Sequence, residues 1–221
     1  MSTERPEDHG IRLITVSASY GAGGSVVAPA LAERLGLPFL QRVTTSEGHP
    51  APPGPCDEKM THDEITPVHR VLAHFTQAIP AGPTQSPPST HHQDVHLRGH
   101  GEAGIHRLLA DGGGVILGRA AAVVLGKEQG YHVRLDGPAD RRAAQGAVIE
   151  GISEAQAREH LRSSDKARGA YVRRLYRTDP ADSSLYHLVI DTTAVPLDTA
   201  IELILTAARA HHATTEHAPA G

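Results

Sequence analysis

Cysteine and aromatic residues are scarce in this sequence of 221 residues. It contains a single cysteine, Cys56, no tryptophan, and only 3% aromatic residues in all. A lone cysteine excludes an intramolecular disulfide and is typical of proteins from a reducing compartment. The shortage of aromatic rings argues against single-stranded nucleic-acid binding, which uses such rings as stacking platforms for bases.

Positive charge and long apolar runs are also lacking. The formal net charge is -4 at pH 7, so the chain as a whole has no electrostatic attraction for DNA or RNA. No apolar run approaches the ~20 residues that span a bilayer, and the polar N-terminus lacks the apolar centre of a signal peptide. We therefore expect a cytoplasmic protein that binds neither nucleic-acid polymers nor membranes. The sequence leaves its oligomeric state open.

What is present is an alternation of strand and helix patterns. Short apolar runs rich in β-branched residues predict strands at 11–17, 37–40, 115–117, 131–135 and 186–190. Helical periodicity and capping signals predict helices at 25–35, 102–110, 120–125, from 138 onwards, 153–176 and 196–212. Strands that alternate with helices imply right-handed crossovers, so the fold class predicted is α/β, a parallel sheet with helices on both faces.

The pattern is interrupted between residues 43 and 101, where proline and histidine are frequent. We interpret this stretch as a flexible insert in a single domain of residues 11–212, with disordered ends at 1–10 and 213–221. His92, His96 and His100 have the spacing of one helix face, which can ligate a transition metal. Neighbouring prolines and glycines argue against a stable helix there, so biased composition is the simpler explanation.

A glycine-rich turn follows the first predicted strand. Its candidate phosphate-binding residues are Tyr20, Gly21, Ala22, Gly23, Gly24 and Ser25. The phosphate-loop pattern G-x-x-x-x-G-K-[ST] matches at its second glycine and at its terminal hydroxyl, which in that pattern binds Mg²⁺. Ala18 replaces the first glycine, and Gly24 replaces the lysine. Successive amides at a helix N-terminus still form an anion site, although an ordinary tight turn would use the same glycines.

Arginines supply the second candidate feature. Arg119 follows the strand at 115–117, where a guanidinium would bind phosphate in a bidentate manner, although a surface arginine at a helix start is the alternative. The helix at 153–178 contains a run of basic residues, among them Arg168 and Arg173, with Asp165 as its only acid between 160 and 178. Such cations would offset phosphoryl charge, whereas most charged runs are solvated helix faces.

Taken in order, several segments resemble the cytidylate kinase-like family of P-loop nucleoside monophosphate kinases. They are LITVSASYGAGGSVVAPALAERLGLPFL, GGGVILGRAAAVVL, GISEAQAREHLRSSDKARGAYVRRLY and DSSLYHLVIDTTAVPLDTAIELI. The resemblance implies a five-stranded parallel sheet, ATP with Mg²⁺, and a nucleoside monophosphate, typically CMP, as acceptor. It implies that residues 20–25 bind the ATP phosphates and that the 43–101 insert lies in the monophosphate-binding region. It also implies that Arg119 binds the acceptor phosphate and that Asp165, Arg168 and Arg173 belong to a lid.

The chain departs from that family at several positions. Family loops of this branch commonly read S-R-E-Y-G-S-G-G-R, whereas this chain has Ala18, Ser19 and Ser25 in place of the first Arg, the Glu and the last Arg. Gln41 replaces the acidic residue usual after the second strand, and no carboxylate follows the third strand. Two hypotheses therefore stand: phosphorylation of a nucleoside monophosphate, and nucleotide binding without transfer in a regulatory or partner-binding role.

Overall fold

The computed structural model describes residues 10–41, 102–118 and 120–216, and these form one parallel sheet with its helices. The strands are β1 (Leu13–Ala18), β2 (Phe39–Gln41), β3 (Gly114–Leu117), β4 (Tyr131–Asp136) and β5 (Leu188–Asp191). They lie in the order β2-β3-β1-β4-β5, and every pair is parallel. The predicted fold class is confirmed, with β1 in the centre of the sheet.

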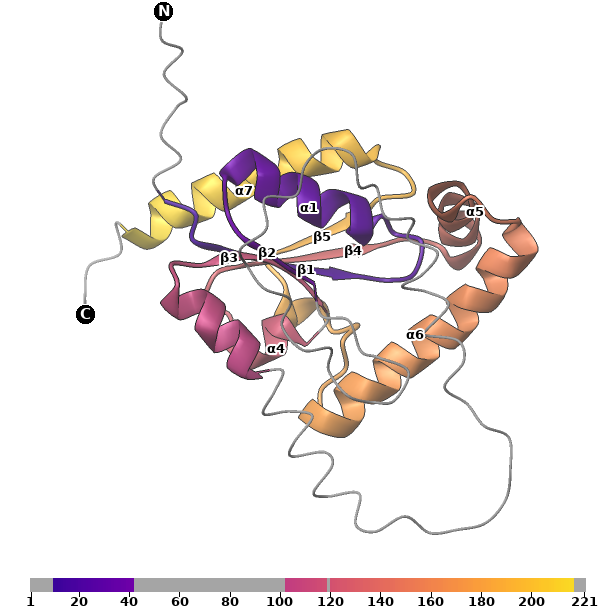
Figure 1. Cartoon of the computed structure of the whole chain (residues 1–221), viewed down its shortest axis with the longest axis horizontal. Helices are drawn as coiled ribbons and strands as arrows, with labels where there is room; N and C mark the ends of the chain where they lie inside the picture. The colour runs from indigo at the N-terminus through magenta and orange to yellow at the C-terminus, as the bar shows by residue number, and fades with distance from the viewer. Residues whose placement is uncertain (1–9, 42–101, 119, 217–221) are drawn as a thin grey trace, which may run out of the picture.

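The helices cover both faces of this sheet (Figure 1). They are α1 (Gly24–Leu35), α4 (Ala121–Leu125), α5 (Ala139–Glu150), α6 (Glu154–Tyr176) and α7 (Leu197–Glu216), and residues 102–110 are also helical. In Figure 1, α1 and α7 lie above the sheet and α4 lies below it, while α5 and α6 extend from its right-hand end. Arg119, the 43–101 insert with His92, His96 and His100, and both predicted disordered ends except residues 10 and 213–216 lie outside the described residues.

Side-chain alternation along β1 explains the layers. Ile14, Val16 and Ala18 belong to the main apolar cluster, which α1 and α7 complete with residues such as Leu31 and Ile204. Successive strand residues face opposite sides of a sheet. The other face of β1 therefore carries Leu13, Thr15 and Ser17, all buried. The second face is thus partly polar, which matters for the site.

The predicted helix boundaries are confirmed where local chemistry defines them. Helix α1 begins at Gly24, after Gly23 with φ 74°, and ends at Gly36 with φ 63°. Glycine suits both positions because it adopts positive φ without a Cβ penalty. Ser153 and Gln156 form the expected capping box at the start of α6. Among the described residues, no helix is both long and apolar enough to cross a membrane.

Candidate functional site

The glycine loop connects the carboxyl end of β1 to the N-terminus of α1. Gly21 and Gly23 both have positive φ, 72° and 74°. In open parallel sheets, ligands bind beyond the carboxyl ends of the strands, and a helix N-terminus attracts anions. The loop therefore has the location that the sequence predicted.

The backbone amides of this loop fall into two groups. The Tyr20 amide donates to Asp165 Oδ1 at 3.1 Å, and the Ala22 amide donates to the Ser19 carbonyl at 3.1 Å. Within the described part of the chain, the remaining amides have no acceptor; they are those of Gly21, Gly23, Gly24 and Ser25. Amides left unsatisfied at a helix N-terminus are satisfied by caps, water or anions. This set fits the oxygens of a polyphosphate.

The glycines of the loop are also required by packing. A Cβ at Gly21 would collide with the carbonyl oxygen of Arg142, and one at Gly23 would lie 2.5 Å from Leu197 Cδ2. A Cβ at Gly24 would lie 2.5 Å from the Cβ of Ala18. The two departures from the phosphate-loop pattern, at positions 18 and 24, are therefore in contact. With an alanine at position 18, only glycine fits at position 24.

Tyr20 contributes to this loop through its backbone, because its side chain is turned away beneath α5 and α6. It is 3% exposed, and its hydroxyl donates to Glu150 Oε2 at 2.8 Å. His160 of α6 lies edge-on to its ring, with 6.1 Å between centroids. Burial, followed by the hydrogen bond to Glu150, raises the pKa of Tyr20 far above its ordinary value. Tyr20 is therefore an anchor for the loop.

Four charged side chains of alternating sign form a row of ion pairs beside the loop. Arg134 Nη2 donates to Asp136 Oδ2 at 2.6 Å, and Arg142 Nε lies 3.5 Å from Asp136 Oδ1. Arg142 Nη1 donates to Asp165 Oδ2 at 2.7 Å. We call Arg134, Asp136, Arg142 and Asp165 the ion-pair chain. Each guanidinium is 9% exposed at its side chain, so these pairs are shielded from solvent.

The ion-pair chain lowers the pKa of Asp136, raises that of Arg134 and makes direct contacts with the loop. Burial alone would raise the pKa of Asp136, but the hydrogen bonds and charge of Arg134 outweigh it, and that pKa lies below its ordinary value. Arg134 Nη2 also donates to Ser19 Oγ at 3.3 Å, and Arg142 Nη1 donates to the Tyr20 carbonyl at 2.8 Å. Both Asp136 and Arg134 are thus charged at neutral pH, as the support of the loop requires.

The opposite end of the loop is held by the segment after β5. Thr192 Oγ1 donates to the Ala22 carbonyl at 2.8 Å, and the Thr192 amide donates to the Asp136 carbonyl at 3.2 Å. Thr192 is 2% exposed. The loop is therefore fixed by β4, α5, α6 and the β5–α7 connection together.

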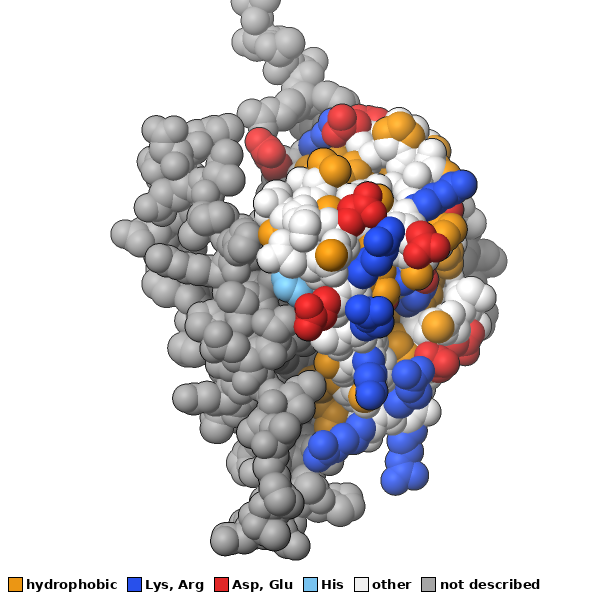
Figure 2. All heavy atoms as spheres, turned by 90° about the vertical axis from the view of Figure 1, so that its right-hand side faces the viewer, with side chains coloured by type: hydrophobic (Ala, Val, Ile, Leu, Met, Phe, Trp, Pro, Cys, Tyr) orange, Lys and Arg blue, Asp and Glu red, His pale blue; other side chains and the backbone are white. Residues whose placement is uncertain are grey.

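Two of the basic residues of α6 form ion pairs at the surface. Arg158 pairs with Glu154 at 2.9 Å and Arg173 pairs with Asp179 at 3.1 Å. Figure 2 shows Lys and Arg side chains gathered over the α5–α6 side of the molecule, with acidic side chains among them. Arg168 is half-buried, and its charge acts on the Tyr20 hydroxyl from nearby. Arg173 is exposed near the end of α6 and pairs with Asp179, whereas Asp165 contacts the backbone of the loop residue Tyr20.

The structure therefore brings together residues 20–25, Asp165 and Arg168, and it adds residues that the sequence reasoning missed. These are Arg134, Asp136, Arg142 and Thr192. Asp136 directly follows the strand predicted at 131–135 and is the last residue of β4, and Arg142 lies in the first turn of α5. Both are therefore at the strand end where ligands of parallel sheets bind. The position of Arg119 is not among those described.

In the part of the chain that the structure describes, no carboxylate or imidazole cluster accompanies the loop as a ready metal site. Among the described residues, no group of three or more His, Cys, Asp or Glu side chains is arranged to bind a metal ion. Ser25 is exposed at the second position of α1, where its hydroxyl has no hydrogen-bond partner among those residues. Magnesium commonly retains waters and takes its ligands from substrate phosphates. Ser25 fits such a shared site as the protein's contribution.

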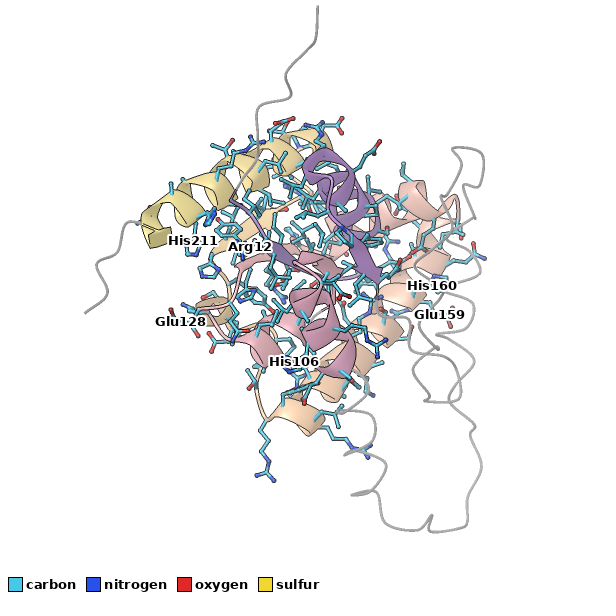
Figure 3. The ribbon with its side chains drawn as sticks, turned by 60° about the vertical axis from the view of Figure 1, so that its left-hand side comes forward. Arg12, His106, Glu128, Glu159, His160 and His211 are labelled. Atoms are coloured by element: carbon cyan, nitrogen blue, oxygen red, sulfur yellow. The ribbon has the colours of Figure 1, made fainter. Side chains whose placement is uncertain are left out.

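A second group of ionisable residues lies at the other end of the sheet. The ring of His132, at the start of β4, stacks on that of His187. The rings of Tyr131, His187 and His211 contact one another, with centroids 4.5 to 5.4 Å apart. Figure 3 shows His211 at the opposite end of the molecule from His160 of α6. These histidines pack where β4, β5 and α7 meet, remote from the loop.

Comparisons with known proteins agree with this arrangement. The model of the cytidylate kinase-like family matches residues 13–194. Over 97 residues the chain is 35% identical to a cytidylate kinase of Methanopyrus kandleri, covering 39% of this chain and 50% of that protein. Over 94 residues it is 33% identical to a uronate isomerase of Corynebacterium glutamicum, covering 42% of this chain and 18% of that protein. The chain thus spans half or less of the length of these curated relatives.

Among solved structures, an uncharacterized protein from Eubacterium ventriosum has a similar fold. The TM-score is 0.59 and the identity is 19%, with 88% of this chain and 96% of that chain covered. At this identity the likeness concerns the fold alone.

Proposed function

Because the chain belongs to the cytidylate kinase-like family, we propose that it transfers a phosphoryl group from ATP to a nucleoside monophosphate, with CMP as the leading acceptor. The observation that carries the proposal is a set of amides at the N-terminus of α1 that have no acceptor among the described residues, those of Gly21, Gly23, Gly24 and Ser25. Amides fixed in this way bind phosphate oxygens without needing to reorganise.

In this proposal the loop holds the donor phosphates and Ser25 shares Mg²⁺ with them. Bound Mg²⁺ would neutralise charge on the transferred group. Arg168 of α6 would add positive charge near the same phosphates, since it lies one helical turn beyond Asp165, which contacts the loop. Arg119 would bind the acceptor phosphate after β3, and Arg173 would join the lid when α6 closes.

A steady-state assay tests this function. The purified protein is incubated with ATP, Mg²⁺ and, in turn, CMP, dCMP, UMP, AMP and GMP, and ADP release is followed together with the diphosphate product by phosphorus NMR. We expect ADP and a nucleoside diphosphate in equal amounts, with CMP giving the largest kcat/KM. ADP release that does not depend on any acceptor would contradict transfer and indicate hydrolysis.

A second function rests on a specific observation. Gly24 stands where the phosphate-loop lysine would be, and the Tyr20 amide is already bonded to Asp165. A protein that binds ATP without transferring phosphate would have this character, and it would act by binding a partner or by regulation. Calorimetry separates the two functions: binding of ATP with no turnover across the panel supports the second and contradicts the first.

A further inference from the structure

Arg142 is a buried cation at the point where the loop, β4 and α6 meet. It is 7% exposed, and its Nε donates to the Gly137 carbonyl at 2.9 Å. Its Nη1 is shared between the Tyr20 carbonyl at 2.8 Å and Asp165 Oδ2 at 2.7 Å. We propose that Arg142 is a positioning residue of the phosphate site, which it serves by fixing the peptide bond between Tyr20 and Gly21. The inference rests on the proposed function of the loop.

The geometry of one peptide unit carries this step. A trans peptide is planar, so its carbonyl and its N–H point in opposite directions. Arg142 draws the Tyr20 carbonyl towards α5, which directs the Gly21 N–H of the same peptide away from α5. That N–H is one of the amides with no acceptor among the described residues. Arg142 therefore orients an amide that it does not touch.

The preceding peptide, between Ser19 and Tyr20, is fixed by Asp165, the ion-pair partner of Arg142. Asp165 Oδ1 accepts the Tyr20 N–H at 3.1 Å while its Oδ2 pairs with Arg142. The backbone N–H and carbonyl of Tyr20 are thus both bound by the Arg142–Asp165 pair. A charged side chain with a single nitrogen donor, such as lysine, lacks the fork that reaches the Gly137 carbonyl and the Tyr20 carbonyl together.

Close backbone packing adds to the same coupling. The Gly21 Cα lies so near the Arg142 carbonyl that a Cβ would collide with it, and a Cβ at Gly146 would lie 2.9 Å from the Tyr20 ring. One face of α5 therefore contacts the loop through Arg142 and Gly146. This contact explains why a displaced guanidinium would change the loop and leave the distant strands as they are.

The charge of Arg142 is needed as well as its shape. Asp136 and Asp165 both face it, and two carboxylates beside a polyphosphate would repel it if the guanidinium were absent. The Arg142→Lys variant keeps this charge and changes only the geometry. It therefore tests positioning separately from charge neutralisation.

The experiment compares Arg142→Lys with Arg141→Lys, the same change at the exposed neighbour on α5. Calorimetry gives the ATP dissociation constant, and hydrogen exchange followed by NMR gives the opening of the Tyr20 and Ala22 amides. Losing a hydrogen bond to a charged group weakens the affected equilibrium by about 10-fold or more. We expect ~10-fold weaker ATP binding and ~10-fold faster exchange at Tyr20 in Arg142→Lys, with Arg141→Lys like the wild type.

Three other outcomes would overturn either the role of Arg142 or the proposed function. Wild-type affinity and exchange in Arg142→Lys would overturn the proposal, as would faster exchange that is uniform through β4 and α7, since that indicates general destabilisation. If the wild type binds no ATP, the proposed function fails, while exchange at Tyr20 still decides the role of Arg142. Should Arg142→Lys fail to fold, Asp165→Asn is measured instead, because it keeps an acceptor for the Tyr20 amide but loses the charge opposite Arg142.

Discussion

At the scale of single residues, the side chain at position 18 restricts which residue fits at position 24. The phosphate-loop pattern pairs glycine with lysine at these positions, and this chain pairs Ala18 with Gly24. A Cβ at Gly24 would lie 2.5 Å from Ala18 Cβ and 3.1 Å from Leu117 Cδ1. Ala18 therefore leaves no room for a lysine at position 24. This dependence is visible only when the two positions are considered together.

This contact predicts non-additive stability in a double-mutant cycle. Gly24→Lys alone should destabilise the protein by about 1–3 kcal/mol, because it overpacks a closed contact. Ala18→Gly in the same chain should recover most of that loss, which gives a coupling free energy of about 1 kcal/mol or more in urea denaturation. Additive effects of the two substitutions would show that the contact is relaxed at no cost and that the linkage is wrong.

At the scale of elements, local sequence signals predicted the helices and strands better than they predicted the contacts of individual side chains. The capping box of Ser153 and the helix start near Gly24 follow from short-range chemistry, and the structure confirms them. The strand predicted at 186–190 instead begins at Leu188, because the Tyr186 hydroxyl turns beneath the sheet to reach Ser17 Oγ at 3.2 Å and the Pro180 carbonyl at 2.8 Å.

Partners of the charged residues could not be predicted in the same way. Asp165 lies three residues before Arg168, a spacing that indicates a shared helix face and gives no sign of distant partners. The structure places Asp165 against Arg142 and against the Tyr20 amide, which is 145 residues away in the chain. Such contacts depend on how α5 and α6 pack beside β1. The sequence therefore located the loop but missed Arg142, Asp136 and Arg134.

The elements at the far end of the sheet predict sensitivity to acid. His132 Nδ1 lies 2.8 Å from Thr15 Oγ1, its Nε2 lies 2.7 Å from the Gly126 carbonyl, and its amide donates to His187 Nδ1 at 2.9 Å. Burial lowers the pKa of His132. Burial first, then the charges of His132, His211 and Lys127, lowers the pKa of His187 to about 4. Both histidines are therefore neutral in the folded protein.

The sign of the effect follows from linkage. Between about pH 6.5 and 4 the unfolded chain binds a proton at His187 and the folded chain does not, and the lowered pKa of His132 acts in the same direction. The free energy of unfolding should therefore fall as the pH drops through that window, and the contribution is complete above pH 6.5. Urea denaturation at several pH values measures this. His187→Asn, which keeps an acceptor for the His132 amide, should flatten the dependence. Parallel curves for the two proteins would assign the acid sensitivity to other groups.

At the scale of the whole molecule, the glycine loop is the meeting point of separate layers. Arg134 and Arg142 join it to β4 and α5, Asp165 joins it to α6, and Thr192 joins it to the segment before α7. A ligand that binds only the folded loop stabilises everything connected to it. At a concentration 100 times its dissociation constant, such a ligand adds about 2.7 kcal/mol to the free energy of unfolding.

The amide set further predicts which part of the nucleotide supplies this stabilisation. Since the unpaired groups are N–H donors at a helix N-terminus, the phosphates should supply most of it and the base little. Thermal unfolding with ATP, inorganic tripolyphosphate and adenosine, each at the same concentration, makes the comparison. We expect ATP and tripolyphosphate to raise Tm and adenosine to leave it unchanged. An equal rise in Tm with adenosine would show that the nucleoside supplies the stabilisation. The binding site would then be a surface for the base and not the glycine loop.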